Sequence, residues 1–510
     1  MQSEGNAIRN IVIVGGGTAG WMSAAVLSRW FPREYCEIHL VESSAIPTVG
    51  VGEATIPSIL KINQMLGIDE PELIRRTKGT YKLGIEFDGW AKSGERYFHP
   101  FGSYGRIVGP IAFPHYWRRF RSAVGGRRAG NLEEYSLNAV AAAARKFDHK
   151  SPSPSGQRGF TSYALHFDAT LYAAYLAEIA ERRGVTRHDS KVVGHRMEDG
   201  SVASIALENG SKLHGDLFID CTGFRALLIG GAMDVGFIDW SRFLPCDRAV
   251  VVQSEPLPDL PPFTRAKAGT AGWQWRIPLQ DRTSNGYVYC SSYIDEEAAQ
   301  TELMANLSTK ATASPRLIRF RTGRRNTAWK RNVVAIGLSA GFIEPLESTS
   351  IHLLQTGLER LLNLMPTKDF RQADIDFYNR SVASEFERVR DFIVLHYHTN
   401  ARTEKFWQDR RTEKIPETLR ERIDLYRGYG RTFKSDDDLF GPVSWTAVME
   451  GQGLHGETHD PFTDCIPGDS LANGLDAIRS DIQRAVANMP SHKAYIEAML
   501  KHAHPGSCES

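Results

Sequence analysis

The chain has 510 residues, of which 42% are hydrophobic and 24% charged, so it can form a multi-domain globular protein with a sizeable core. Its 61 Lys and Arg residues against 60 Asp and Glu residues leave a formal charge of +1, which argues against wholesale binding of a nucleic-acid backbone. The six cysteines are scattered without a CxxC pair, which argues against a zinc site and a disulfide framework. We expect no resident metal.

One stretch, residues 11–27, is apolar enough to imitate a signal peptide or a membrane span. Glycines at 15–17 and at 20 interrupt it, and no clear cleavage site follows. No other stretch is apolar for long enough to cross a bilayer, in line with a mean hydropathy of −0.33. The sequence therefore predicts a soluble, cytoplasmic protein with no membrane partner and no nucleic-acid partner.

The first predicted elements are a strand, a glycine-rich turn and a helix. Residues 11–14 are a β-branched run, residues 15–20 read GGGTAG, and residues 21–30 have helical spacing before a second strand at 37–42. This order is typical of the opening βαβ unit of a doubly wound sheet, where a dinucleotide pyrophosphate binds at a helix N-terminus. Glu42 ends the second strand 22 residues after the last glycine, where a carboxylate can accept hydrogen bonds from a ribose. The alternative is a glycine-rich turn in an unrelated α/β fold.

Two later segments indicate which dinucleotide to expect. Residues 216–224 and 332–341 each combine a strand pattern with a glycine turn, and the second continues into a helical pattern at 351–364. In flavoproteins of the hydroxylase type, the chain leaves the nucleotide domain, builds a substrate layer and returns to close on the flavin. The spacing favours FAD over NAD, although each segment alone also fits an ordinary strand with a tight turn.

The residues between these segments contain strand-like runs, such as 248–253. We expect a substrate-side sheet over approximately 85–160 and 225–315. The predicted organisation is a core over residues 1–365 that includes this sheet, followed by a mostly helical C-terminal region over 366–510 that completes the substrate pocket.

Three further stretches concentrate chemistry. Residues 272–278 (GWQWRIP) place two tryptophans one residue apart on a predicted strand, so that both rings project from the same face. Residues 341–350 (GFIEPLESTS) put a carboxylate beside small hydroxyl residues at the start of a helix, where N–H groups can hold an anion. Residues 80–85 (TYKLGI) embed a lysine in an apolar run, which is costly unless the lysine is exposed or used.

These stretches resemble the flavin-dependent halogenases, whose best-known members are tryptophan halogenases. The motifs that carry the resemblance occur in the family's order, and they are GGGTAGW (15–21), VGVGEATIP (49–57), TYKLGI (80–85), HPFG (99–102), WQWRIP (273–278) and GFIEPLEST (341–349). The fold implied is α/β, with a Rossmann-like FAD-binding core of the flavin monooxygenase type, a substrate-side sheet and a mostly helical C-terminal region.

The resemblance implies a reaction in stages. An NAD(P)H-dependent flavin reductase supplies FADH₂, which reacts with O₂ to give a C4a-hydroperoxide. Chloride or bromide attacks the distal oxygen, and the resulting hypohalous acid passes through an internal tunnel to a lysine beside the substrate. Electrophilic substitution on an electron-rich aromatic ring follows. The protein contributes placement and the exclusion of water.

Two residues match the family's catalytic groups. Lys82 matches the lysine that binds hypohalous acid or forms a haloamine, and the alternative is an ordinary strand-edge lysine that reaches solvent. Glu347 matches the group thought to orient the electrophile or to help remove the ring proton, and the alternative is a helix-capping carboxylate. The backbone N–H groups of Thr349 and Ser350 are expected to bind halide. Many relatives have glycine at the position of Ser350. If the backbone there needs a positive φ, serine instead of glycine costs about 1 kcal/mol or more.

The remaining site residues are also implied by the resemblance. Those expected to bind the flavin are Gly15, Gly17, Thr18, Ala19, Gly20, Glu42, Glu53, Val193, Gly337, Leu338 and Ile351. Those expected to line the substrate pocket are His99, Phe101 and Trp445, while Trp273 and Trp275 would block a monooxygenase-like approach to the flavin. The Tyr-Tyr-Glu pattern with which tryptophan-specific members grip the amino acid is absent around Trp445, which shifts the expected substrate to indole or a related small aromatic.

Two other enzymatic functions and one non-enzymatic function stay open from the sequence alone. The enzyme could be a tryptophan halogenase proper, or a flavin monooxygenase of the same fold that transfers oxygen directly. The third alternative is a non-catalytic flavin-binding protein that has kept the scaffold. A homodimer is expected by family analogy only.

Overall fold

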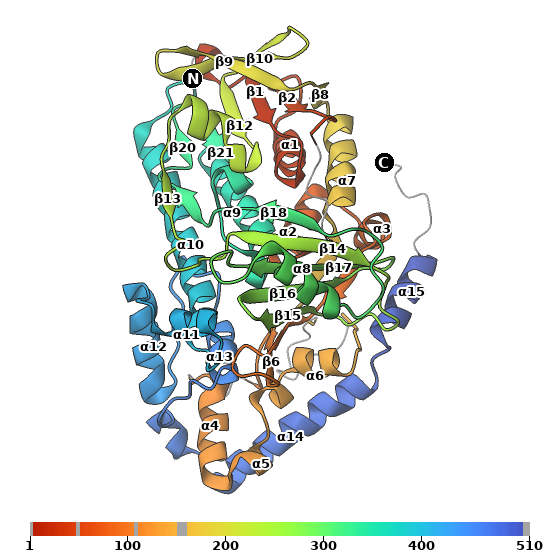
Figure 1. The fold of residues 1–510 in the computed structure, drawn as a ribbon, viewed down its shortest axis with the longest axis vertical. Coiled ribbons are helices and arrows are strands. Elements are labelled where there is room, and N and C mark those ends of the chain that lie inside the picture. The colour runs from red at the N-terminus through yellow and green to blue at the C-terminus, as the bar shows by residue number, and fades with distance from the viewer. Residues whose placement is uncertain (1–3, 47–51, 107–110, 150–160, 503–510) are drawn as a thin grey trace. The chain divides into compact units, whose positions relative to one another are not determined.

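The computed structural model describes residues 4–46, 52–106, 111–149 and 161–502 (Figure 1). The chain forms two compact units, each assembled from three separate stretches. The first unit comprises Met1–Thr77, Phe167–Pro245 and Phe320–Arg388, and the second comprises Lys78–His166, Cys246–Arg319 and Val389–Ser510. Residue 365, where the sequence predicted a domain boundary, lies within the Phe320–Arg388 stretch of the first unit. The long helix α10 (Gln372–His398) begins in that unit and ends in the second.

The first unit is built on a six-stranded sheet in the order β20-β21-β12-β1-β2-β8. All neighbouring strands are parallel except β20 and β21. The strands are β1 (Asn10–Val14), β2 (Glu37–Glu42), β8 (Thr186–Asp189), β12 (Leu217–Asp220), β20 (Trp329–Lys330) and β21 (Val333–Ala335). The central strands β1 and β12 are almost wholly buried, as expected for parallel strands covered on both faces. The βαβ opening predicted from the sequence is confirmed.

Helices and smaller sheets complete the first unit. The helices are α1 (Thr18–Trp30), α2 (Ser58–Leu66), α3 (Glu70–Arg76), α7 (Ala169–Arg182) and α9 (Ser350–Asn363), with short turns η1 (Glu4–Asn6), η3 (Gly223–Arg225), η4 (Leu227–Ala232), η5 (Gly337–Ser339) and η6 (Pro345–Glu347). The remaining strands are β3 (Gly52–Ala54), an antiparallel sheet of β9 (Val192–Glu198), β10 (Ser201–Leu207) and β11 (Lys212–His214), and a second of β13 (Phe237–Asp239), β19 (Gly323–Arg325) and β22 (Gly341–Phe342).

A buried carboxylate organises the turn after β12. Asp220 has no exposed surface and accepts hydrogen bonds from the hydroxyl of Thr222 at 2.6 Å and from the backbone N–H groups of Leu228 and Ile229, both at 2.8 Å. These two N–H groups belong to the first turn of η4, so the strand end and the turn are held by one side chain. The sequence predicted the strand and its glycine turn but not this carboxylate.

The second unit is built on a seven-stranded sheet in the order β18-β14-β17-β16-β15-β5-β6. Its strands are β5 (Gly84–Asp88), β6 (Arg96–Pro100), β14 (Arg248–Ser254), β15 (Thr264–Gly269), β16 (Gly272–Pro278), β17 (Thr283–Tyr289) and β18 (Arg316–Arg319). Neighbours are antiparallel except β5 and β15. Separately, the short strand β4 (Thr80–Lys82) pairs antiparallel with β7 (Ala164–Asp168).

Helices make up the rest of the second unit. They are α4 (Phe113–Val124), α5 (Gly126–Ala129), α6 (Leu137–Ala143), α8 (Glu296–Ala305), α11 (Lys405–Thr412), α12 (Glu417–Tyr429), α13 (Pro442–Gly451), α14 (Gly468–Ala487) and α15 (His492–His502), with turns η2 (Leu132–Tyr135) and η7 (Pro461–Cys465). The prediction of sheet over 85–160 holds only for its first part. From Phe113 onward the described chain is largely helical, because Phe113, Trp117 and Phe120 recur at helical spacing and are buried together.

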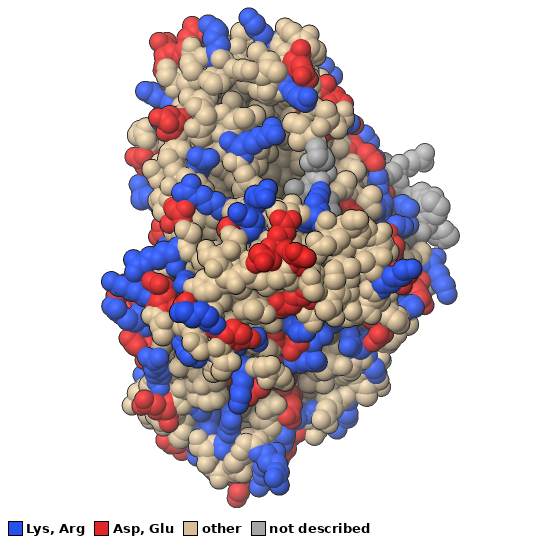
Figure 2. All heavy atoms as spheres, viewed as in Figure 1, with Lys and Arg blue, Asp and Glu red and all other residues tan. Residues whose placement is uncertain are grey.

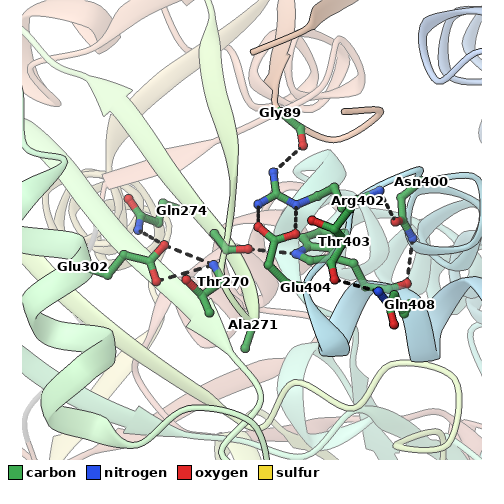
Figure 3. A network of polar contacts seen from close by, with 12 residues as sticks. Gly89, Thr270, Ala271, Gln274, Glu302, Asn400, Arg402, Thr403, Glu404 and Gln408 are labelled. Atoms are coloured by element: carbon green, nitrogen blue, oxygen red, sulfur yellow. Dashed lines mark hydrogen bonds and ion pairs between the residues drawn. The ribbon is translucent and has the colours of Figure 1, made fainter. Parts of the chain in front are cut away.

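The hairpin between β15 and β16 is fixed by polar contacts from two sides (Figure 3). Glu302 of α8 accepts a hydrogen bond from Thr270 N–H at 3.1 Å within the turn. Trp407 of α11 donates from its indole to Gly269 O at 2.8 Å. Arg402 donates to Gly89 O at 2.7 Å and pairs with Glu404. The strand that carries the two tryptophans is therefore anchored at its start.

The face of the molecule shown in Figure 2 carries basic and acidic side chains intermixed. An acidic group lies over the start of α8, where Asp295, Glu296 and Glu297 are exposed. Within the described part of the chain, no helix is long and apolar enough to cross a membrane. Over the same residues, no three His, Cys, Asp or Glu side chains gather in a way that could hold a metal ion.

Candidate active site

The turn between β1 and α1 is built from glycines where side chains cannot fit. Gly15 has a φ of +111°, and a Cβ on it would lie 2.3 Å from Cys221 O. A Cβ on Gly20 would lie 1.7 Å from Gly15 O. A Cβ on Gly17 would instead meet open space, and Gly17 caps α1 without a side-chain hydrogen bond. The loop therefore presents the start of α1, at Thr18, to open space, and this fits a dinucleotide pyrophosphate.

Glu42 lies directly beside this turn. A Cβ on Gly16 would overlap the Glu42 side chain, at 1.6 Å from Oε2. Arg187 of β8 pairs with Glu42 Oε1 at 2.7 Å. Burial raises the pKa of Glu42, against the opposing effects of the Arg187 charge and a hydrogen bond with Trp21. The carboxylate predicted to receive the ribose is thus next to the glycine turn and already oriented.

The segment predicted to return to the flavin does return. Its strand β21 is parallel to β12, and a Cβ on Gly337, which has a φ of +73°, would lie 2.9 Å from the Cβ of Ala19. Leu338 beside it is 36% exposed, whereas Ile351 is buried in α9. A second segment that closes on the first glycine turn fits FAD, as the sequence predicted.

Two other residues predicted to bind the flavin lie in separate strands. Glu53 is half-buried in β3. Val193 lies in β9, and 62% of it is exposed. Their assignment to the flavin remains a prediction.

The loop that precedes α9 holds the residues predicted to bind halide. Glu347 ends η6 with 1% of its surface exposed. Ser348 adopts a left-handed conformation with a φ of +61°, which costs about 1 kcal/mol for a residue other than glycine. Thr349 is the N-cap of α9, and Ser350 begins the helix with an ordinary backbone. The strained, positive-φ backbone that the sequence suggested for Ser350 is therefore found at Ser348, two residues earlier.

The Thr349 side chain fits an anion. Thr349 is fully buried, and within the described chain its hydroxyl has no hydrogen-bond partner. A buried hydroxyl without a partner is uncommon, since most such groups are satisfied by protein or by water. Its position at a helix N-terminus, where the helix dipole favours negative charge, suits a halide ion.

Helix α9 is fixed from behind by a buried carboxylate that the sequence analysis did not identify. Glu385 of α10 accepts from Thr356 at 2.8 Å and from Arg360 at 2.5 Å, and its other oxygen lies 3.1 Å from His352 Nε2. Burial acts to raise the pKa of Glu385, but the hydrogen bond from His352 and the charge of Arg360 outweigh it and hold the pKa below its ordinary value. His352 also contacts Ser58 at 2.9 Å, which ties α9 to the start of α2.

Lys82 lies in the second unit, on β4, with no exposed surface. Thr80 is opposite His166 and Lys82 is opposite Ala164, so these four side chains share one face of the β4–β7 pair. Lys82 Nζ lies 5.3 Å from the centre of the Phe101 ring. The lysine is a buried group in contact range of a predicted pocket residue, and the strand-edge, solvent-reaching alternative is excluded.

His166 is held neutral by a chain of hydrogen bonds. Thr80 donates its only hydroxyl proton to Pro278 O at 2.8 Å, so it accepts from His166 Nδ1 at 2.9 Å. The opposite ring nitrogen, Nε2, lies 2.9 Å from the hydroxyl of Thr264, which donates to it. Burial and the nearby Lys82 charge hold the pKa of His166 well below its ordinary value. The chain connects the lysine strand to the end of β16.

A second buried imidazole, that of His492 in α15, contacts the same strand. Tyr81 N–H donates to His492 Nε2 at 3.1 Å, and His492 Nδ1 donates to Leu260 O at 2.8 Å. Burial lowers the pKa of His492 to about 4, so it is neutral at pH 7. The sequence carried no signal for this contact, because its partners are 411 positions apart.

The pocket residues predicted from the sequence belong to an aromatic cluster. His99 of β6 lies 5.8 Å from the ring of Phe392 and 6.3 Å from that of Phe440. Phe392 stacks on Phe440 at 3.9 Å and meets Trp445 of α13 edge-on at 5.0 Å. The structure thus brings His99 and Trp445 together through two rings that the sequence analysis did not identify.

The paired tryptophans of β16 lie on one face, as predicted. Their ring centres are 6.1 Å apart, and Trp275 packs over Gly286, where a Cβ would lie 2.1 Å from the indole. Trp273 is almost fully buried. Neither indole N–H has a hydrogen-bond partner among the described residues.

Two glycine substitutions separate flavin binding from folding. Gly17→Ala is expected to leave the thermal unfolding of the flavin-free protein unchanged, because its Cβ meets open space, and to weaken FAD binding by on the order of tenfold. Gly20→Ala is expected to lower both the unfolding temperature and the affinity for FAD, because its Cβ would overlap the backbone oxygen of Gly15. Flavin fluorescence titration and thermal melts measure the two effects. An unchanged FAD affinity in Gly17→Ala would place the pyrophosphate elsewhere.

The buried histidine makes stability depend on acid. The pKa of His492 is about 4 in the folded protein against 6.5 in the unfolded chain, so between these values only the unfolded chain binds the proton. The free energy of unfolding should therefore fall by ~1.4 kcal/mol per pH unit from this group as pH falls from 6.5 toward 4. Urea denaturation at several pH values should show a shallower slope in His492→Gln. Identical slopes would contradict a neutral His492.

Known proteins match the chain along most of its length. The family model described as tryptophan halogenase matches residues 10–468. The chain is 35% identical to tryptophan 6-halogenase SttH of Streptomyces toxytricini, over 96% of this chain and 98% of that protein. It is 36% identical to 7-chloro-L-tryptophan 6-halogenase KtzR of Kutzneria sp. (strain 744), over 96% of this chain and 99% of that protein.

Solved structures agree with this match. BrvH, a flavin-dependent halogenase from Brevundimonas sp. BAL3, is 45% identical with a TM-score of 0.92, over 96% of this chain and 99% of that one. Xcc4156, a flavin-dependent halogenase from Xanthomonas campestris, is 41% identical with a TM-score of 0.93, over 97% and 98%. The predicted fold class is confirmed. The chain belongs to the tryptophan halogenase family and is a flavin-dependent halogenase, an enzyme that uses FADH₂ from a separate reductase, O₂ and a halide ion.

Proposed function

We propose that the enzyme halogenates a free, electron-rich aromatic of the indole type beside Lys82, with chloride or bromide as the halogen source. The observation that carries this proposal is the aromatic cluster around His99 and Trp445. Arg422 approaches this cluster: its guanidinium carbon lies 4.7 Å from the centre of the Trp445 ring, and it is already paired with Asp438 at 2.5 Å. An aromatic wall with its nearby charge satisfied supports a substrate without an amino-acid handle.

The first unit supplies the flavin and halide sites in this proposal. The glycine turn and the start of α1 bind the pyrophosphate, and Glu42 accepts from the ribose. Thr349, through its hydroxyl, and the N–H groups at the start of α9 hold the halide. When bound, the reduced flavin and O₂ supply the oxidising equivalent that converts halide to hypohalous acid.

The second unit supplies the lysine of the halogenation site. Lys82 Nζ donates a hydrogen bond to hypohalous acid or carries the halogen as a haloamine, and its full burial keeps the electrophile from bulk water. The aromatic ring attacks the halogen, the ring proton is lost, and the hydroxyl of hypohalous acid leaves as water. Glu347, which belongs to the first unit, is assigned to orient the electrophile or to accept the ring proton, and its burial suits a group that works away from solvent.

A second candidate substrate is free tryptophan. The relatives SttH and KtzR are named for tryptophan and for 7-chloro-L-tryptophan. Against this stands the absence of the Tyr-Tyr-Glu pattern around Trp445. Membership of the family favours halogenation over the monooxygenase and non-catalytic alternatives. A homodimer, expected by family analogy, remains part of the proposal.

Removal of the lysine amine should uncouple the two stages. Lys82→Ala is expected to lower the rate of aromatic bromination by about two or more orders of magnitude, since the amine proposed to hold the electrophile beside the ring is removed. Flavin oxidation and hypohalous acid formation should continue. Product by mass spectrometry and hypohalous acid by a dimedone trap measure the two stages. The control is Lys92→Ala at an exposed lysine, and wild-type product from Lys82→Ala would refute the assignment.

Substrate choice is tested by competition. Purified enzyme with FAD, NADH, a generic flavin reductase and bromide is offered indole and tryptophan in parallel and then together. We expect a bromine isotope doublet on indole and little on tryptophan, because the Tyr-Tyr-Glu pattern that would grip its ammonium and carboxylate is absent around Trp445. Equal or faster turnover of tryptophan would overturn the substrate proposal and leave the halogenase assignment intact.

A further inference from the structure

The lysine strand β4 is short and has one paired side. Its three residues pair with Ala164, Leu165 and His166 of β7. Tyr81, which directly precedes Lys82, directs its backbone N–H away from β7 to His492 Nε2 at 3.1 Å. A three-residue strand is held by few ladder hydrogen bonds, so a partner on its outer edge has a large share in fixing it.

The chemistry of His492 suits an edge partner. Its Nδ1 lies 2.8 Å from Leu260 O, and because a carbonyl can only accept, Nδ1 carries the proton. Nε2 is therefore a lone-pair acceptor, aimed at Tyr81 N–H. In this position the imidazole replaces the carbonyl that a neighbouring strand would otherwise supply.

The helix that carries His492 also grips the Tyr81 side chain. Tyr81 donates from its hydroxyl to Met499 Sδ at 3.1 Å, and its ring meets Tyr495 edge-on at 5.5 Å. On its other side the ring stacks on Phe147 at 4.2 Å. Helix α15 therefore contacts both the backbone and the side chain of the residue next to Lys82.

The start of α15 is itself anchored to the same unit. His492 N–H donates to Arg145 O at 2.9 Å, and Ser491 forms a bridge with Lys146. Lys146 Nζ donates to Ala487 O at 2.8 Å just before this point. His492 is thus held in place by residues 145–146, although His492 itself lies beyond residue 468, where the family match ends.

We propose that His492 is a positioning residue for Lys82, and that α15 acts as a clamp on the lysine strand. The inference rests on the proposed role of Lys82 as the group that delivers the halogen. Loss of the clamp shifts Tyr81 and with it the adjacent lysine. A displacement of about 1 Å is enough to cost on the order of 100-fold in a positioned reaction.

The first test measures how well the β4 backbone is protected from hydrogen exchange, and it requires no catalytic turnover. Deuterium uptake of peptides that cover residues 78–86 is compared in wild type, His492→Phe, His492→Gln and Glu497→Gln, the last an exposed control on the same helix. His492→Phe, which has no acceptor, should raise uptake in these peptides, whereas the amide oxygen of His492→Gln should restore part of the protection. Unchanged uptake in His492→Phe, or raised uptake spread through the whole second unit, would overturn the proposal.

The second test measures how hypohalous acid is divided between the brominated product and the trap. In His492→Phe we expect wild-type flavin oxidation, about tenfold less brominated product for each flavin oxidised, and a matching rise in trapped hypohalous acid, with partial recovery in His492→Gln. A variant that loses flavin oxidation and product in parallel would indicate a merely structural role and would overturn the proposal. The role of Lys82 is judged separately by Lys82→Ala, so normal product from that variant refutes the proposed function while the deuterium result still decides the clamp.

Discussion

The buried ammonium of Lys82 is the constraint on which the second unit depends. A charge without solvent contact is expensive, and a second positive charge beside it is more so. The imidazole next to it on the same face, that of His166, must stay neutral for this reason, and its hydrogen bonds to Thr80 and Thr264 leave no place for a second proton. The ring of Phe101 adds the negative face of its quadrupole at 5.3 Å.

In the first unit, backbone N–H groups without side-chain caps lie at the two places that we propose bind anions. At the first place, glycines remove the side chains that would close the turn around the start of α1. At the second, the left-handed Ser348 precedes Thr349, whose buried hydroxyl makes no capping hydrogen bond to the first N–H groups of α9. Both places are helix N-termini, and in both the local backbone accepts a cost so that the helix end stays available.

Neutral and charged polar groups have distinct roles behind these sites. In the first unit, the buried carboxyl groups of Asp220 and Glu385 each accept hydrogen bonds from several donors and fix the turn after β12 and the back of α9. In the second unit, the imidazoles of His166 and His492, which contact the lysine strand, are neutral, and their hydrogen bonds fix their tautomers.

The sequence by itself determined the elements whose signal is local. The strand at β1, its glycine turn and the strand at β2 follow from a period and from residues that only a tight turn requires. The motifs around Lys82 and Glu347 could also be recognised in the sequence, and the structure places both side chains in buried positions. The predicted sheet was wrong over α4, whose buried aromatic residues recur at helical spacing in the sequence. The tertiary structure alone decided that C-terminal helices join the second unit and that His492 reaches Tyr81 across 411 positions. Such contacts have no spacing rule, because they depend on which distant surfaces are buried together and not on the conformation of either segment.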